Sequence, residues 1–467
     1  MKKRLISLIL AAIVLLSCAF AEETGNVPLM AYYECFAVPL GENALFEIPN
    51  EWGYQTSDAA DVPPMTSLLT DQNQMVMAMK LPADWEATDA SDALGIQSFI
   101  VEGTALMLGL TTPQSTRLQE MTINDMPAVL VEMKGQGFDI LWIGDSGDLY
   151  FFLFPNDDDV LVQQMIAVAQ SLCVFHRKGE QVNPASDFAY TADGGEVTIT
   201  DYIGTSEHVL IPDAIDGLPV TTLGHRAFYE KTVTTVVVPD SVTEIGAACF
   251  SGDNYLVSLK LPDGLKRLPP ASLESCMRLY DFDLPQSLEK IYSSVFEFNY
   301  YLTHLTLPSS LTEIEQLNFI GLYGLQSLTL AEDNAAFKLD ETNGLLMTAD
   351  GTRLLHCFSD IVPAEEIILP EGVKIVDPFA FHYDYDVERI VLPEGVETIG
   401  AMAFAMCPNL TEIVIPASVT DIGVMDGLEG RTGIISYKRN VIVTPEGCPA
   451  WNWAVETGAT VKSPEEN

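Results

Sequence analysis

Prolines recur along the second half of the chain at a regular spacing, within a repeated pattern of apolar positions. They are Pro239, Pro262, Pro285, Pro308, Pro370, Pro393 and Pro416, so five of the six steps are 23 residues and one is 62 residues. Large apolar residues follow nearly every one of them by three, six and eleven residues, as Val242, Ile245 and Phe250 follow Pro239. Self-similarity at such a period is typical of a solenoid, in which each turn repeats one structural unit.

The structure of one unit follows from its pattern. The segment before Pro308 alternates apolar and polar residues, which predicts a short strand with Leu305 and Leu307 facing the core. Pro308 ends this strand because it has no N–H to donate. Ile314 and Phe319 then follow at a spacing that strands do not have, so we expect a turn and a short helical or irregular segment there. Burial of about seven large side chains, at roughly 2 kcal/mol each, does not exceed the entropy lost on ordering one unit, so the units must stack on one another.

The residues of the repeat also carry a resemblance to a known family. The segment LPEGVETIGAMAFAMCPNLTEIVIP at 392–416 resembles the repeat of the BspA-like leucine-rich repeat family of bacterial surface proteins. The resemblance covers residues 188–461, with a lead-in at 190–228 and a capping helix and strand at 444–461. It implies a leucine-rich-repeat solenoid with parallel strands and 23-residue repeats, and an extracellular or cell-surface role in binding or adhesion without a shared ligand.

The 62-residue step marks an insert at about 330–369. Asn343-Gly344 and Asp350-Gly351 are typical of tight hairpin turns. We therefore expect this segment to loop out as a hairpin, after which the stacking register resumes.

Residues 27–176 show no repeat and predict a separate α+β domain. The patterns typical of strands lie at 44–52, 74–82, 126–135, 138–144 and 148–155. Residues 91–109 and 157–172 have patterns typical of helices. Late antiparallel strands followed by a final helix indicate the α+β class, and the order of elements resembles the PsbP-like fold. The polar segment 177–187 predicts a linker.

The N-terminal 21 residues have the pattern of a signal peptide. Lys2 to Arg4 are basic, Leu5 to Leu16 form an uncharged apolar run, and Ala19 to Ala21 offer a cleavage site before Glu22. The alternative is a lipobox, in which Cys18 would be lipidated and anchor the protein. No other segment reaches 18 apolar residues, so no transmembrane span is expected.

Composition narrows the class of partner. The chain of 467 residues has 23 basic and 66 acidic residues, a net charge of −43. Nucleic-acid binding needs a cationic face, so this class is excluded. Of eight cysteines, seven follow residue 21, and an odd number at wide spacing does not predict a disulfide framework. A bridge between Cys35 and Cys173 stays open, and the cysteines of the repeats are interpreted as small core residues.

The chain shows no motif typical of an active site. Residues 144–147 read Gly-Asp-Ser-Gly, as around the nucleophile of trypsin-like proteases, but no matching histidine segment precedes them and a tight turn is favoured. Asp157 to Asp159 lack the spacing of a calcium loop, and the histidines lack metal-type spacing. Trp451 and Trp453 favour packing of the end cap over stacking on a sugar. We therefore predict no catalytic residue, metal site or cofactor.

The outward positions of the repeat strands remain as the predicted binding face. Core packing fixes the inward residues, whereas the residues between them vary freely. The predicted binding residues are Asp281, Asp283, His304, Thr306, Arg389 and Glu412. No residue type repeats along this face, which favours a protein partner, with a carbohydrate as the alternative. Two other classes stay open, a structural envelope protein with the repeats as spacer, and an enzyme or small-ligand binder in the first domain.

Overall fold

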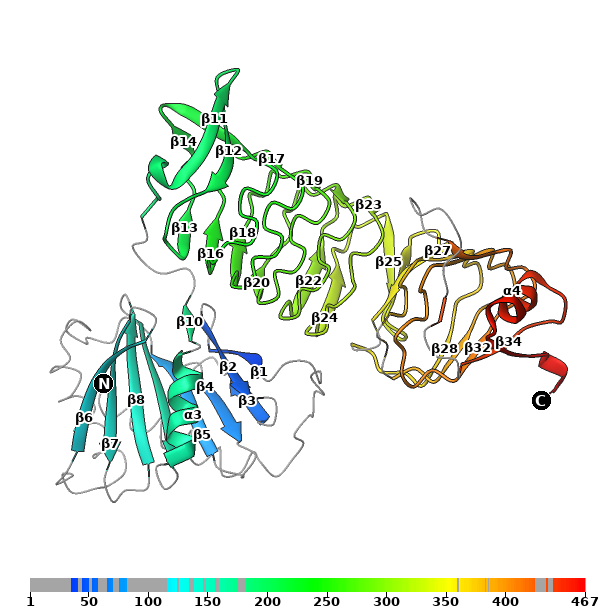
Figure 1. The fold of residues 1–467 in the computed structure, drawn as a ribbon, viewed down its shortest axis with the longest axis horizontal. Coiled ribbons are helices and arrows are strands. Elements are labelled where there is room, and N and C mark those ends of the chain that lie inside the picture. Colours follow the sequence, from blue (N-terminus) through cyan, green and yellow to red (C-terminus); the bar gives the residue numbers. More distant parts are fainter. Residues whose placement is uncertain are drawn as a thin grey trace. The chain divides into compact units, whose positions relative to one another are not determined.

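The computed structural model divides the chain into two compact units, Met1–Gln181 and Val182–Asn467 (Figure 1). The structure describes residues 35–40, 44–49, 53–57, 65–69, 75–81, 116–123, 126–133, 138–145, 148–155, 159–170, 172–174, 181–358, 361–382, 384, 386–424, 434–435 and 440–466. The predicted signal peptide at 1–21, including Cys18, and the predicted helix at 91–109 lie outside these residues.

The first unit contains a seven-stranded antiparallel sheet. In order across the sheet, its strands are β3 (Gly53–Ser57), β4 (Met65–Leu69), β5 (Met75–Leu81), β9 (Asp148–Pro155), β8 (Phe138–Asp145), β7 (Met126–Met133) and β6 (Thr116–Ile123). A smaller sheet consists of β1 (Cys35–Pro39), β2 (Ala44–Pro49) and β10 (Cys173–Val174). The helix α3 (Asp159–Gln170) contacts β9 and β2, and the Phe46 ring meets that of Phe152 at 5.3 Å.

The five strands predicted in this unit are confirmed as β2, β5, β7, β8 and β9, and the final helix as α3. The strands β1, β3, β4, β6 and β10 were not predicted. Gly144 and Asp145 belong to β8, and Asp145 pairs with Asp148 of β9; residues 146 and 147 of the predicted turn lie outside the described residues.

The pairing of β1 and β10 with β2 tests the disulfide bridge between Cys35 and Cys173 that the sequence left open. Cys35 pairs with Pro49 on one side of β2, and Cys173 pairs with Leu45 on the other side. Two strand spacings of about 4.8 Å and an offset of four residues of about 3.3 Å each place the two Cα atoms well over 10 Å apart. A disulfide joins Cα atoms less than about 7 Å apart, so this register does not allow the bridge.

The second unit is a β-solenoid of about 11 turns with repeats of about 23 residues over 197–462. Its core forms two clusters, which define a first stack (residues 188–330) and a second stack (residues 353–462). Most turns contribute one strand to a front face and one to a back face, and neighbouring turns pair in parallel. The predicted solenoid of parallel strands is therefore confirmed.

The first stack begins at a short helix and a hairpin. These are η1 (Ala185–Asp187), β11 (Phe188–Asp193) and β12 (Glu196–Tyr202), followed by the short strand β14 (Ala214–Ile215). Its front strands are β13 (His208–Leu210), β16 (Thr235–Val237), β18 (Ser258–Lys260), β20 (Asp281–Phe282), β22 (His304–Leu307) and β24 (Ser327–Leu330) (Figure 1). Its back strands are β15 (Leu218–Leu223), β17 (Glu244–Ile245), β19 (Arg267–Leu268), β21 (Lys290–Ile291) and β23 (Glu313–Ile314).

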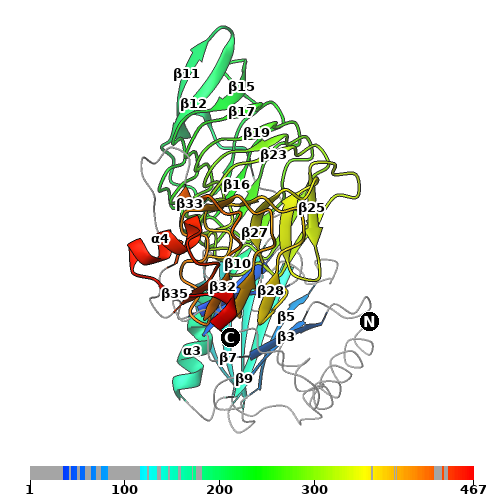
Figure 2. The ribbon, with the colours of Figure 1, turned by 90° about the vertical axis from the view of Figure 1, so that its right-hand side faces the viewer.

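The second stack ends in a helix and a last strand. Its front strands are β28 (Glu366–Ile368), β30 (Arg389–Val391), β32 (Glu412–Val414), β34 (Val441–Val443) and β35 (Thr460–Lys462) (Figure 2). Its back strands are β27 (Arg353–Cys357), β29 (Ile375–Val376), β31 (Thr398–Gly400) and β33 (Asp421–Val424). Between β34 and β35 lies α4 (Pro449–Thr457), which buries Trp453 and leaves Trp451 half-buried; η2 (Pro464–Glu466) follows β35.

The back strands correct one prediction. The stretch after each proline was expected to be irregular, yet Glu313 and Ile314 pair in parallel with Lys290 and Ile291. Ile314 points into the core and is 3% exposed, while Glu313 is exposed. Strands of two residues are too short to show the alternation from which a strand is predicted.

The structure of the insert corrects a second prediction. The insert does not loop out, because β25 (Phe337–Asp340), β26 (Leu345–Thr348) and β27 form an antiparallel meander whose last strand pairs with β29 of the back face. Leu346 and Leu355 belong to the core of the first stack, whereas Leu345 and Leu354 belong to that of the second. The insert is thus a partition between two cores. Its hairpin turns are confirmed at Gly344 and Gly351, with φ of 65° and 74°.

The predicted linker at 177–187 ends earlier than expected. The backbone N–H of Asn183 donates to the carbonyl of Leu210 at 2.9 Å, and the Asn183 Oδ1 accepts from the Leu210 N–H at 2.8 Å. These bonds attach residues from Asn183 onward to the first stack.

Candidate functional site

The front face of the second stack carries a ladder of ion pairs. The parallel register places Glu366, Arg389 and Glu412 side by side on β28, β30 and β32. The Nε of Arg389 donates to Glu412 Oε1 at 2.8 Å, its Nη1 donates to Glu366, and the Nζ of Lys462 donates to Glu412 Oε2 at 2.9 Å. Four charged side chains are thereby joined by ion pairs along the front face.

The charges of the ladder stabilise one another. Hydrogen bonds to Glu412 and then Glu366 raise the pKa of Arg389 above its usual value. Hydrogen bonds from Arg389 and Lys462 lower the pKa of Glu412. The ladder joins two basic side chains to two acidic ones, so its formal charges cancel.

An apolar stripe runs beside this ladder, two residues further along each strand. It consists of Ile368, Val391 and Val414, which are in register on β28, β30 and β32. Ile368 is 57% exposed, and the two valines are half-buried. A row of partly exposed apolar side chains is the kind of surface that protein partners cover.

Over its later turns, the front face of the first stack is polar instead. The Nδ1 of His304 lies 2.7 Å from Ser327 Oγ, and the hydroxyls of Thr306 and Thr329 lie 2.8 Å apart. The Ser258 hydroxyl donates to Asp281 Oδ2 at 2.6 Å. These bonds join neighbouring turns along the face.

The six predicted binding residues lie on the front face of the solenoid, but the structure does not bring them together. Asp281 lies on the four-stranded sheet that ends at β20, and Asp283 lies just beyond that strand. His304 and Thr306 lie on the two-stranded sheet of β22 and β24, and Arg389 and Glu412 lie on the second stack. Of the six, Arg389 and Glu412 touch one another.

Sequence reasoning missed three residues of this surface, Glu366, Ile368 and Lys462. The first two had a readable signal, because they precede Pro370 by the same steps as Arg389 and Val391 precede their own proline. Lys462 also precedes a proline, Pro464, by two residues, but Pro416, Pro445 and Pro464 no longer keep the 23-residue spacing, so the repeat did not place it near Glu412.

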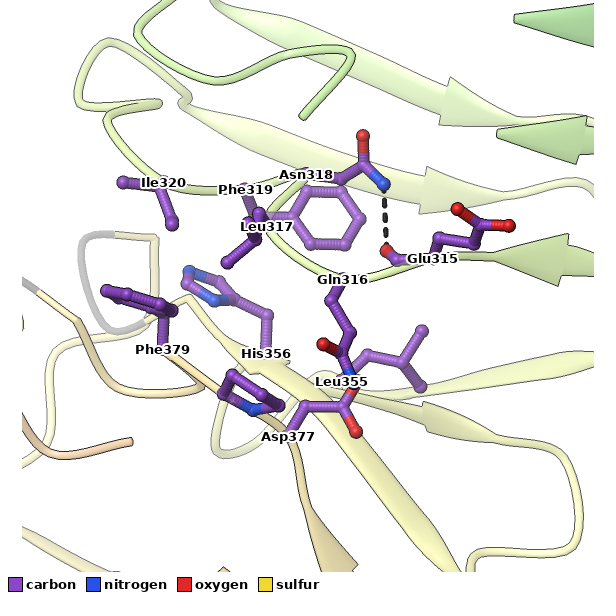
Figure 3. A pocket seen from close by; sticks show the side chains of 11 residues that line it. Glu315, Gln316, Leu317, Asn318, Phe319, Ile320, Leu355, His356, Asp377 and Phe379 are labelled. Carbon is purple, nitrogen blue, oxygen red and sulfur yellow. Dashed lines mark hydrogen bonds between the residues drawn. The ribbon is translucent and has the colours of Figure 1, made fainter. Parts of the chain in front are cut away.

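A pocket lies where the turn after β23 meets β27 and the segment after β29 (Figure 3). The His356 side chain lies among Phe319, Phe358 and Phe379, with ring centroids of the first two at 5.6 and 4.8 Å from its own. The Nε of Arg353 donates to Asp377 Oδ1 at 2.6 Å on its border. The free space is about 10 Å³, the room that one water molecule needs.

The chemistry of this pocket is that of a packed core. Burial, and secondarily the nearby His382, lowers the pKa of His356 to about 3, and burial lowers the pKa of His382 to about 4. Both imidazoles are therefore neutral at physiological pH. A pocket of this size holds no substrate, and we interpret it as packing where the two stacks meet the insert.

A column of buried polar residues ties successive turns together. It lies fourteen residues after the repeat prolines, where Cys276, Asn299 and Cys407 each donate to a carbonyl 26 residues earlier in the chain. The distances are 3.2, 2.9 and 2.8 Å. The cysteines are buried as predicted, and they also act as hydrogen-bond donors.

Asp253 occupies the same column and is fully buried. Its Oδ1 accepts the N–H of Tyr255 at 3.4 Å, and its Oδ2 has no hydrogen-bond partner among the described residues. Burial raises the pKa of this carboxyl to about 8.

Within the described ranges, no three His, Cys, Asp or Glu side chains gather as metal ligands would. No helix in this part of the chain has the length and apolarity needed to cross a membrane.

Part of the second unit matches a known protein family. Residues 221–340 and 355–425 match the BspA type leucine rich repeat region in six copies. The match lies entirely in the second unit, and the comparisons do not support the PsbP-like resemblance of residues 27–176. No curated protein matches the chain.

Several solved structures are similar to part of the chain. A leucine-rich repeat protein of T. pallidum is 23% identical, with 60% of this chain and 98% of that one covered and a TM-score of 0.30. A leucine rich cell surface protein of Faecalibacterium prausnitzii is 19% identical over 59% and 97%, with a TM-score of 0.32. The pneumococcal vaccine antigen PcpA is 14% identical over 61% and 97%, with a TM-score of 0.36.

Proposed function

We propose that this chain is a non-catalytic binding protein, secreted or held at the cell surface, which contacts a protein partner through the front face of its second stack. The observation that carries the proposal is the pairing of an ion-pair ladder with a partly exposed apolar stripe on the same three strands. The pattern of the first 21 residues supports export.

The physical argument is one of pre-organisation. The side chains of the ladder are already ordered by their mutual bonds, so a partner does not have to immobilise them on binding. The stripe then supplies apolar area that loses water in the complex. The polar front face of the first stack, with Asp281, Asp283, His304 and Thr306, extends this surface to a larger partner.

The test uses the full chain without its predicted signal segment as bait for extracellular proteins. A captured partner is then measured against the double variant Ile368→Ser/Val391→Ser and the control Thr243→Ala/Thr312→Ala by surface plasmon resonance; both threonines are exposed and lie directly before back strands of the first stack. The proposal expects a loss of affinity of about tenfold or more in the first variant and less than about threefold in the control. If a protein or carbohydrate partner binds both variants with the affinity of the unmodified chain, the second stack's front face is not the binding site.

A further inference from the structure

The apolar stripe of the second stack is bordered by carboxylates at both ends of its strands. Glu365 and Glu388 directly precede β28 and β30, and Glu371 and Glu394 follow the prolines after these strands. All four side chains are exposed. None of them forms an ion pair with a residue of the described ranges. We call these four residues the acidic rim.

The rim is not neutralised by the cations of the same face. Arg389 and Lys462 are bonded to Glu366 and Glu412, so the ladder contributes no net charge. The four rim carboxylates then leave this surface negative around an apolar centre. The rest of the protein adds to the same field, because the full chain has a net charge of −43.

The first stack has no such surface over its later turns. At the positions that correspond to the stripe stand Lys260, Asp283, Thr306 and Thr329, which are exposed and polar. Over its first two turns the first stack carries a smaller surface of the same kind, with Leu210 and Val237 in register and the exposed Asp213 and Asp240 beyond them. The second stack adds a third apolar residue and the ion-pair ladder beside it.

We propose that this face docks a basic protein segment in which apolar side chains alternate with lysine or arginine. The proposal rests on the proposed function and names the chemistry of its partner. The apolar side chains cover the stripe, and the basic side chains reach the rim, whose two rows lie roughly 10 Å from the stripe on either side, at about 3.3 Å a residue. A second copy of this chain does not fit, because two acidic rims would face each other.

Electrostatics and apolar contact have separate signatures in this arrangement. Attraction to the exposed rim is screened by salt and mainly accelerates association. Contact with the stripe depends on the apolar side chains of the segment and is little affected by salt. A surface that used charge alone would bind any polycation equally well.

The experiment measures binding of fluorescent synthetic peptides to the full chain by anisotropy, at low and at physiological salt. The peptides alternate Lys with Val, Lys with Ser, or Glu with Val. We expect the Lys/Val peptide to bind at least about tenfold more tightly than the Lys/Ser peptide, and the Glu/Val peptide not to bind. Equal binding of both lysine peptides would overturn the proposal, and so would no binding of the Lys/Val peptide.

Variants then locate the binding. Glu371→Gln/Glu394→Gln should weaken the Lys/Val peptide and reduce its salt dependence. The control Glu244→Gln/Glu341→Gln makes the same charge change at exposed positions on a back strand and on the insert, and should leave the affinity within about twofold. Equal weakening by both variants would show attraction to the total charge of the protein and contradict the proposal.

The outcome separates the two proposals. A captured partner that is lost in Ile368→Ser/Val391→Ser but ignores Glu371→Gln/Glu394→Gln would refute the basic segment and leave the proposed function standing. A partner that ignores both variants would refute the proposed function.

Discussion

Replacement of Asp253 by asparagine should stabilise the first stack at neutral and alkaline pH. The carboxyl is fully buried, and its Oδ2 has no hydrogen-bond partner in the described part of the chain. Two turns later, Asn299 occupies the same column and donates its amide to the carbonyl of Leu273 at 2.9 Å. An amide at Asp253 keeps the acceptor that bonds Tyr255 and adds a donor without a charge.

The size of the effect follows from proton linkage. Burial raises the pKa of Asp253 from 3.8 to about 8. Between these values the folded state holds a proton that the unfolded state has released, so stability falls as the pH rises. At about 1.4 kcal/mol per pH unit, the loss amounts to roughly 4 kcal/mol by pH 7. Because the surroundings relax, we expect Asp253→Asn to recover about 1–4 kcal/mol at pH 7 to 8 and almost nothing near pH 4.

The assay is thermal and urea unfolding, followed by circular dichroism at pH 4, 7 and 8.5. Asp263→Asn is the control, because this exposed aspartate loses the same charge without relief of burial. The difference in stability between Asp253→Asn and the unmodified protein should grow with pH, and that of the control should stay nearly flat. An Asp253→Asn variant with an unchanged pH profile, or with lower stability at pH 8, would refute a buried protonated carboxyl.

Three further predictions concern the core, the ladder and the histidine at the insert. Leu305→Ala should cost about 2–5 kcal/mol in urea unfolding and the neighbouring Thr306→Ala less than about 0.5; equal losses would contradict the inward and outward assignment. Arg389→Ala should cost up to about 1 kcal/mol at low salt, and a cost that survives high salt would argue against an ionic origin. Since burial holds the pKa of His356 at about 3 against 6.5 unfolded, stability should fall as the pH drops below 6.5, less steeply in His356→Leu; parallel acid-unfolding curves would contradict this.

The repeat made much of the second unit predictable. A strict phase of 23 residues assigns each residue to a column, so the inward positions of Leu305 and Leu307 followed from alternation alone. The back strands were not predictable in this way, because a pair such as Glu313–Ile314 is too short to show a period.

The insert shows what the spacing between the prolines does not predict. A step of 62 residues tells that the phase is interrupted, but not whether the extra residues leave the solenoid or join it. The continuous apolar runs Leu345-Leu346-Met347 and Leu354-Leu355 were the missed signal, because a strand that is buried on both faces does not alternate.

The sequence predicted the face on which the candidate surface lies, but not all of the residues that form it. The phase placed Arg389 and Glu412 on one face and on adjacent turns, where the structure joins them. The partner Lys462 comes from a strand that follows α4, and only three-dimensional closure of the last turns brings it to Glu412. The spacing of residues in the sequence does not predict an ion pair between strands that α4 separates.

Amide hydrogen exchange of the full chain, with and without its captured partner, tests most directly whether the front face of the second stack is where the protein binds. The proposed function expects slower exchange on binding in β28, β30 and β32 and unchanged exchange in the described strands of the first unit. Slower exchange confined to residues 35–174, with the second stack unaffected, would contradict it and move the binding site to the first unit.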